Sequence, residues 1–273
     1  MGWKTSLIII ENKHHFTNDN ALIEALGFDN LVYKREATFE ETLHPEKNTF
    51  AIGYHRDNII ISDGHQLTNR GLEKTDGLKL AKYEQNLTQL FPDAEILTVA
   101  CYSTSNFHGY SLIQNGDRQR LKIVGEGFKK EWGVPLAEEN QLYQNATQQD
   151  GEWVWQDDDD TLTEDQLMED FTFTVAKRRL GVRLDEAEGE DLLENTPFKV
   201  YEFLELPVNG LERRYTAAQM GDLCDDCGRG LGLAIDPQNE RLKISILSFG
   251  CKADWLTAHP AKKDLSWPRG LFQ

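Results

Sequence analysis

The hydrophobic pattern at the start of the chain is typical of strands buried in a sheet. Ser6 to Ile10 is rich in isoleucine, which predicts a strand covered on both faces and central in its sheet. Two β-branched or aromatic runs, 49–54 and 58–62, are separated by three polar residues and predict an antiparallel hairpin. A second hairpin is predicted over 110–124, because Asn115-Gly116 suits a type I′ turn.

Helices are predicted where apolar residues recur at three- and four-residue spacings. The polar residues 18–20 can cap a short helix that ends at Gly27. Residues 72–91 are expected to form a single amphipathic helix. Farther along, Thr163-Glu164-Asp165-Gln166 has the form of a capping box and Gly181 suits a helix end, so a helix is expected between them.

Hairpins with a few intervening helices favour the α+β class over a doubly wound α/β fold. We expect a largely antiparallel or mixed sheet with flanking helices in residues 1–145. Residues 146–273 are expected to form a smaller subdomain, a helix plus a β-hairpin packed against the first half, with the hairpin arms at 231–235 and 242–247. The polar stretch 138–161 marks this boundary, and a single continuous domain is the alternative.

The net charge of the chain disfavours some classes of binding partner. Asp and Glu number 46 against 29 Lys and Arg, a formal net charge of −17. Such a surface repels phosphate backbones and anionic lipids, so neither nucleic acid nor membrane is predicted as a partner. Residues 150–170 contain ten acidic residues and no Lys or Arg. We expect this region either to stay solvated or to contact a basic protein partner.

Cysteine content and the start of the chain favour a cytoplasmic location. Four cysteines in 273 residues are too few for a disulfide scaffold. The apolar run after Lys4 is too short for a secretory signal, and no stretch reaches the length of a membrane span. Reduced thiols are therefore expected.

Gly228 to Ile235 reads Gly-Arg-Gly-Leu-Gly-Leu-Ala-Ile. These eight residues resemble the glycine box of histidine-kinase-type ATPases, and the resemblance implies nucleotide binding. In that family the box opens a helix and follows two upstream boxes, which this chain does not show. Here Asp236-Pro237 follows at once and an alternating strand comes next, so the residues themselves predict the first arm of a hairpin.

The same segment offers a structural zinc site. Cys224 and Cys227 have the Cys-x-x-Cys-Gly spacing of a zinc knuckle, and the two aspartates between them disfavour a redox thiolate. Pairing of the predicted hairpin brings Cys251 to the same end. His259 or Cys101 could supply the fourth ligand. We therefore predict no cofactor other than this zinc ion.

Two functions remain open. The first is a non-catalytic protein-binding module whose contact is the acidic surface. Trp153 and Trp155 lie two residues apart on a predicted strand and could form a binding platform on one face, or pack on the following helix. The predicted contact also includes the acidic residues Asp157, Asp158, Asp159 and Asp160.

The alternative is a hydrolase-like enzyme with its site between the two halves. The sequence contains neither Gly-x-Ser-x-Gly nor His-Glu-x-x-His. Cys101 as a nucleophile, with His108 or His55 as its base, is the candidate catalytic set, although a cysteine in an apolar strand is usually part of the core. The sequence does not decide whether the protein is an enzyme.

Overall fold

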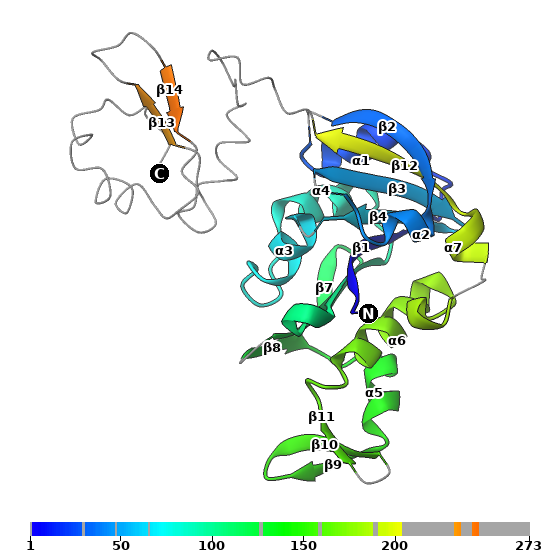
Figure 1. Ribbon diagram of the computed structural model, residues 1–273, viewed down its shortest axis with the longest axis vertical. Helices are drawn as coiled ribbons and strands as arrows, with labels where there is room; N and C mark the ends of the chain where they lie inside the picture. The colour runs from blue at the N-terminus through cyan, green and yellow to red at the C-terminus, as the bar shows by residue number, and fades with distance from the viewer. Residues whose placement is uncertain are drawn as a thin grey trace. The chain divides into compact units, whose positions relative to one another are not determined.

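The computed structural model contains two compact units, residues 1–204 and 205–273 (Figure 1). In the first unit it describes residues 2–28, 31–46, 48–64, 66–125, 128–157, 160–187 and 191–203. In the second unit it describes the backbone of 232–235 and 242–245.

A nine-stranded sheet forms the centre of the first unit, in the order β2-β12-β3-β4-β1-β5-β6-β7-β8, and all neighbouring strands are antiparallel. An α+β fold with a largely antiparallel sheet is thereby confirmed. The strands are β1 (Lys4–Glu11), β2 (Leu31–Thr38), β3 (Thr49–His55), β4 (Asn58–Asp63), β5 (Ile96–Tyr102), β6 (Phe107–Gln114), β7 (Asp117–Gly125), β8 (Phe128–Gly133) and β12 (Pro197–Phe203).

Two smaller sheets accompany it. The first unit contains a three-stranded sheet of β9 (Ala146–Gln149), β10 (Glu152–Asp157) and β11 (Asp160–Thr163). In the second unit, β13 (Gly232–Ile235) pairs with β14 (Leu242–Ser245) in antiparallel fashion, which confirms the predicted hairpin.

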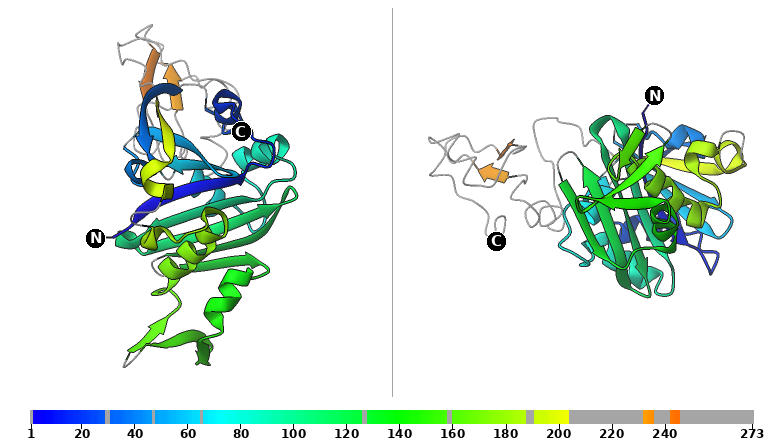
Figure 2. Two further views of the ribbon diagram at one scale, coloured as in Figure 1. Left: turned by 90° about the vertical axis from the view of Figure 1, so that its right-hand side faces the viewer. Right: turned by 90° about the horizontal axis from the view of Figure 1, so that it is seen from below.

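Helices cover both faces of the large sheet (Figure 2). On one face lie α1 (Asp19–Ala25), α3 (Gln66–Leu72) and α4 (Lys82–Leu90). On the other lie α2 (Phe39–Thr42), α5 (Ala137–Tyr143), α6 (Met168–Leu180) and α7 (Asp191–Asn195), with the 3-10 turn η2 (Leu184–Glu186). A second 3-10 turn, η1 (Ser103–Ser105), connects β5 to β6. Among the described residues, no helix combines the length and the apolarity needed to cross a membrane.

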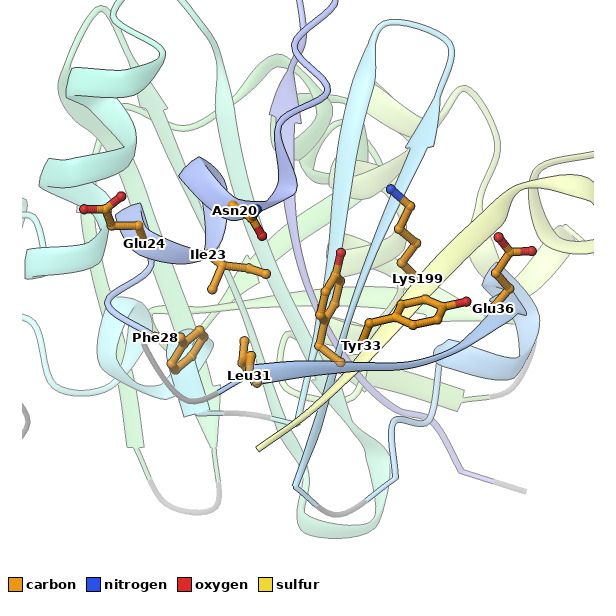
Figure 3. Close-up of a pocket in the computed structure, with 9 residues that line it drawn as sticks. Asn20, Ile23, Glu24, Phe28, Leu31, Tyr33, Glu36 and Lys199 are labelled. Carbon is orange, nitrogen blue, oxygen red and sulfur yellow. The ribbon is translucent and has the colours of Figure 1, made fainter. Parts of the chain in front are cut away.

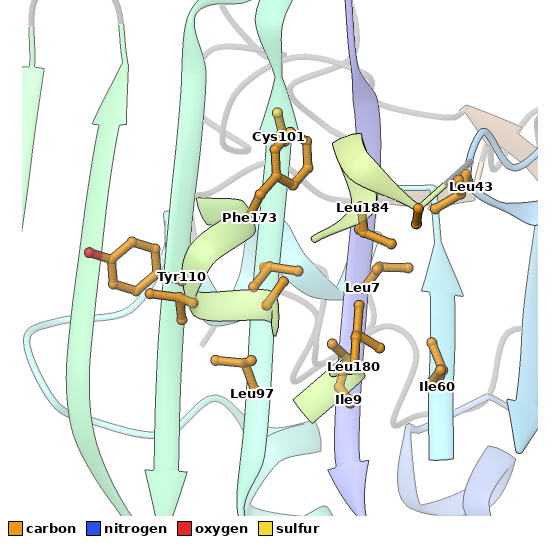
Figure 4. Close-up of a cluster of buried hydrophobic side chains, with 14 of the residues drawn as sticks. Leu7, Ile9, Leu43, Ile60, Leu97, Cys101, Tyr110, Phe173, Leu180 and Leu184 are labelled. Carbon is orange, nitrogen blue, oxygen red and sulfur yellow. The ribbon is translucent and has the colours of Figure 1, made fainter. Parts of the chain in front are cut away.

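Strand β1 shows why the first apolar run is continuous. Leu7 and Ile9 face the core beneath α6, whereas Ile8 and Ile10 face the core beneath α1 and α4 (Figure 4). Because alternate side chains on a strand point to opposite faces, a strand covered by helices on both sides must be apolar throughout. The prediction of a central, doubly buried strand is confirmed, since β1 is the fifth of the nine strands.

The predicted hairpins at β3–β4 and β6–β7 are both confirmed. The second turn has positive φ at Asn115 (52°) and Gly116 (82°), as a type I′ turn requires. The single helix predicted over 72–91 is wrong. That region contains the end of α3, a loop, and α4 from Lys82, and Gly77 in the loop has φ of 60°, outside the helical region.

Strand β12 lies between β2 and β3, although more than 140 residues separate it from them in the sequence. The description of the fold as two halves is therefore not confirmed, and the boundary at residue 145 stays a prediction. Close packing holds β12 in place. Phe198 pairs with Gly53 across the strands, and its ring stacks on Phe39 at a centroid distance of 4.9 Å.

A β-bulge in β7 places the side chains of Arg118 and Arg120 on opposite faces of the sheet. Ile113 pairs with Arg118 and Leu112 pairs with Arg120, so the residue between the two arginines has no partner in β6. Arg118 forms a fully buried ion pair with Glu84 of α4 on one face. On the other face, Arg120 donates from Nε and Nη2 to Glu139 of α5 at 2.9 and 2.7 Å. Without the bulge both side chains would point the same way.

The contact of Gly53 with Phe198 predicts a clear cost for Gly53→Ala. A Cβ atom at this position would lie 2.2 Å from Phe198 Cε2, so the ring must shift and the free energy of unfolding should fall by about 1–3 kcal/mol. Urea unfolding measures the change. Gly64→Ala is the matched control, because a Cβ there meets no atom within 4 Å. Equal stability of the two variants would contradict the packing.

The Arg118–Glu84 pair predicts a strongly non-additive double mutant. Arg118→Met leaves the Glu84 carboxylate buried without its cation, and the free energy of unfolding should fall by about 3–5 kcal/mol. Burial raises the pKa of Glu84, and Arg118 opposes that shift, so the Glu84 carboxylate depends on Arg118 to stay charged. Replacing both charged side chains by neutral ones should therefore restore most of the free energy of unfolding that Arg118→Met loses. Glu84→Gln in the double variant keeps an acceptor for the Ala81 N–H at the start of α4.

Chemical denaturation of the two single variants and the double variant completes the cycle. Arg35→Met, in a half-exposed ion-pair network, is the control and should leave the unfolding midpoint near that of the wild type. Additive losses in the cycle would show that the two side chains are not coupled.

Candidate functional site

Cys101 and His108 face each other across neighbouring strands. Cys101 is near the end of β5, His108 is near the start of β6, and the two are direct partners in the antiparallel register. Side chains of such a pair point to the same face of the sheet. Both are buried, with Cys101 0% and His108 3% exposed. Cys101 belongs to the apolar cluster that packs beneath α6 (Figure 4).

Glu169 in the first turn of α6 completes the cluster. Its Oε2 accepts a hydrogen bond from Ser103 Oγ at 2.5 Å and lies 3.9 Å from Cys101 Sγ. Ser103, at the start of η1, also accepts a hydrogen bond from the backbone N–H of Trp3 at 3.1 Å. Glu169 and Ser103 are partly exposed, so they form the solvent side of a cluster whose other members are buried.

These side chains form a set of potential metal ligands. Cys101 Sγ, a ring nitrogen of His108 and a carboxylate oxygen of Glu169 lie within 4.8 Å of one another. His108 Nδ1 is buried and makes no hydrogen bond within the described part of the chain. Because a buried imidazole nitrogen without a partner is unfavourable, this orphan atom calls for a ligand or a water molecule.

The electrostatics of the cluster oppose a reactive thiolate. Burial raises the pKa of the Cys101 thiol to about 12, and the nearby Glu169 carboxylate adds to the rise. Burial also lowers the pKa of His108, with Glu169 partly offsetting the effect. Both groups are therefore neutral near pH 7, whereas a nucleophilic cysteine usually relies on an imidazolium or other cation to stabilise its thiolate.

His55 is not part of this cluster. It ends β3, which is separated from β5 by β4 and β1, and its Nδ1 lies 2.8 Å from Thr196 Oγ1. The structure thus brings together two of the three predicted catalytic residues, Cys101 and His108, and places the third elsewhere. Whether any of them is catalytic stays a prediction.

The predicted acidic surface is described only in part. Trp155 is buried and its Nε1 donates to Leu142 O at 3.0 Å. Trp153 is half-buried against Tyr143 and lines a hollow of about 410 Å³ beside Phe128. Asp160 is exposed at the start of β11.

The remaining predicted contact residues, the side chain of Asp157 and all of Asp158 and Asp159, lie outside the described residues. Binding of a basic protein through this surface therefore stays a prediction. The predicted zinc ligands also lie outside the described residues; they are Cys224, Cys227, Cys251 and His259.

Sequence reasoning missed Glu169 and Ser103. Acidic residues are common in the first turn of a helix because they favour the helix dipole, so nothing in the sequence distinguishes Glu169 from Asp170 beside it. Ser103 follows a strand in a run of small polar residues typical of a turn. Ser103 is near Cys101 because it follows two residues later in the chain, whereas only the packing of α6 on β5 and β6 brings Glu169 to Cys101.

Comparison with known proteins adds no assignment: no family model, no curated protein and no solved structure matches the chain.

Proposed function

We propose that the protein binds a thiophilic divalent metal ion, of which Zn²⁺ is the principal candidate, through Cys101, His108 and Glu169. The observation that carries the proposal is the convergence of three different ligand types from β5, β6 and α6 within 4.8 Å. Thiolate, imidazole and carboxylate are the three side-chain ligands that zinc uses in proteins.

The spacing of the ligand atoms supports zinc coordination. Zn–S bonds of about 2.3 Å and Zn–O bonds of about 2.1 Å place the sulfur and oxygen about 3.6 Å apart in a tetrahedral site. Cys101 Sγ and Glu169 Oε2 are separated by 3.9 Å, so a small inward movement suffices. A bound cation would also stabilise the thiolate that the apolar surroundings otherwise oppose.

Three protein ligands leave one tetrahedral position free. Sites with three protein ligands and a water molecule are typical of zinc enzymes, whereas purely structural zinc sites have four protein ligands. Glu169 and Ser103 lie on the partly exposed side of the cluster, where a water molecule or a substrate oxygen could approach. Hydrolysis is therefore the reaction class that we propose for this site.

Metal analysis of the purified full chain tests the proposal. We expect the wild type to bind zinc and both Cys101→Ser and Glu169→Gln to lose it. Substitution of residues that surround a zinc site lowers zinc affinity roughly 10- to 100-fold, and loss of a ligand itself should lower it further. Glu194→Gln is the control, because Glu194 is exposed on α7 and the charge change is the same. Zinc affinity equal in all three variants and the wild type would contradict the site.

Cobalt spectroscopy separates this site from the one predicted at Cys224 and Cys227. Co²⁺ in place of zinc should give a thiolate-to-metal charge-transfer band that Cys101→Ser abolishes and that the double variant Cys224→Ser/Cys227→Ser retains. Azide should then shift the visible bands if the fourth position is free. A spectrum unchanged by azide would mean a closed four-ligand site and would exclude hydrolysis there.

A further inference from the structure

A hollow of about 540 Å³ lies between α1, β2 and β12, on the opposite side of the sheet from Cys101 (Figure 3). Its volume is within the usual range of small-molecule sites. Ile23 and Phe28 line one side, and Tyr33 and Lys199 line the other. The hollow shares no residue with the proposed metal site.

Aromatic rings form much of the wall. Tyr33 and Tyr201 meet edge to face with centroids 6.2 Å apart, and Phe28 packs against Phe50 and Phe203 of the core. Tyr33 is 55% exposed, unusually open for a large aromatic side chain. Ring faces attract organic cations, because the electron density of the ring concentrates there.

The charges around the hollow favour a positive ligand. Glu24 and Glu36 line it, and neither carboxylate has a cationic partner among the described residues. The positive charge of Lys199 is balanced by an ion pair, since its Nζ lies 2.7 Å from Asp19 Oδ2. Two carboxylates thus remain uncompensated, in a chain whose formal net charge is −17.

Hydrogen bonds to the buried Asp19 carboxylate hold Tyr201 in this wall. Asp19 accepts hydrogen bonds from the hydroxyl groups of Tyr54 at 2.5 Å and Tyr201 at 2.7 Å, in addition to its contact with Lys199. These contacts lower the pKa of Asp19 against the opposing effect of burial, so it stays ionised at neutral pH. Tyr201 is consequently fixed by its hydroxyl end, and its ring remains in place to form part of the hollow.

We propose that this hollow binds an organic cation, an alkylammonium or guanidinium group on a short aliphatic arm. The carboxylate of Glu36 and the rings of Tyr33 and Tyr201 would receive the charged group, and Ile23 would contact the aliphatic arm. Glu24, at the other end of the hollow, adds to its negative potential. The same chemistry occurs in a free amine and in a Lys or Arg side chain of a peptide. Because β2 is the edge strand of the sheet among the described residues, a peptide could also pair with it.

Calorimetric titration of the full chain with n-butylammonium and n-butylguanidinium tests the proposal, with n-butanol as the uncharged comparison. We expect both cations to bind and the alcohol not to bind. Tyr33→Ser should weaken cation binding about two- to fivefold, the effect of losing one exposed cation–π contact. Glu36→Gln should weaken it and reduce its dependence on salt.

Glu40→Gln is the matched control, because Glu40 is exposed on the neighbouring helix α2 and does not line the hollow. It should bind the cations as the wild type does. Absence of binding by the wild type, or equal weakening by Glu36→Gln and Glu40→Gln, would overturn the proposal. Neither result bears on zinc binding, which is measured separately.

Short capped peptides containing one lysine identify the source of the cation. Tighter binding of the peptide than of n-butylammonium, with the gain lost on backbone N-methylation, indicates a peptide strand added to β2. Equal affinity of the peptide and the free amine indicates a small-molecule ligand. Either result supports the cation site, whereas an acetyl-lysine peptide that binds as well as the lysine peptide contradicts it.

Discussion

The fold of the first unit depends on the pairing of β12 between β2 and β3. Without this strand, β2 would have no backbone partner in the large sheet, because β2 pairs only with β12 among the described residues. The pairing joins segments more than 140 residues apart, so its entropic cost is offset only when the rest of the unit is in place. Phe198, seated over Gly53 and stacked on Phe39, supplies the apolar contact that fixes the strand.

The same strand also shapes one of the two sites. Lys199 and Tyr201 alternate with Phe198 and Val200 along β12, so one pair faces the hollow while the other faces the core beneath α2 and α7. The hollow is therefore a product of strand insertion, since Lys199 and Tyr201 of β12 and Tyr33 of β2 all line it. The metal-ligand cluster depends instead on α6, which carries Glu169 onto the end of the β5–β6 hairpin.

Both faces of the sheet are stabilised by charged groups as well as apolar ones. The bulge in β7 directs Arg118 to α4 and Arg120 to α5, and Lys122 extends the second set with an ion pair to Glu164 at 2.5 Å. The ring of Phe171 lies 4.2 Å from Lys122 Nζ. Buried cations on one strand thus tie helices on opposite faces to the sheet, and each has an acidic partner that offsets part of the desolvation cost.

Local patterns determined much of this architecture. Alternation and turn chemistry predicted β1, the β3–β4 and β6–β7 hairpins of the large sheet, β13–β14 and the end of α6 at Gly181, because these features depend on neighbouring residues. The helical spacing of apolar residues gave a wrong prediction over 72–91, because that spacing continues across the loop between α3 and α4.

The residues of the two proposed sites could be predicted from the sequence only in part. The sequence indicated Cys101 and His108 as candidates for chemistry, but Glu169 joined them only through the packing of α6. The hollow beside Tyr33 required β12 to insert beside β2. Sequence by itself determined the strands and turns with strong local signals, such as β1 and the turns at Asn115-Gly116 and Gly181, since those depend on neighbouring residues. Only the tertiary structure decided which distant side chains meet, because long-range pairing is selected by the combined packing of the whole unit.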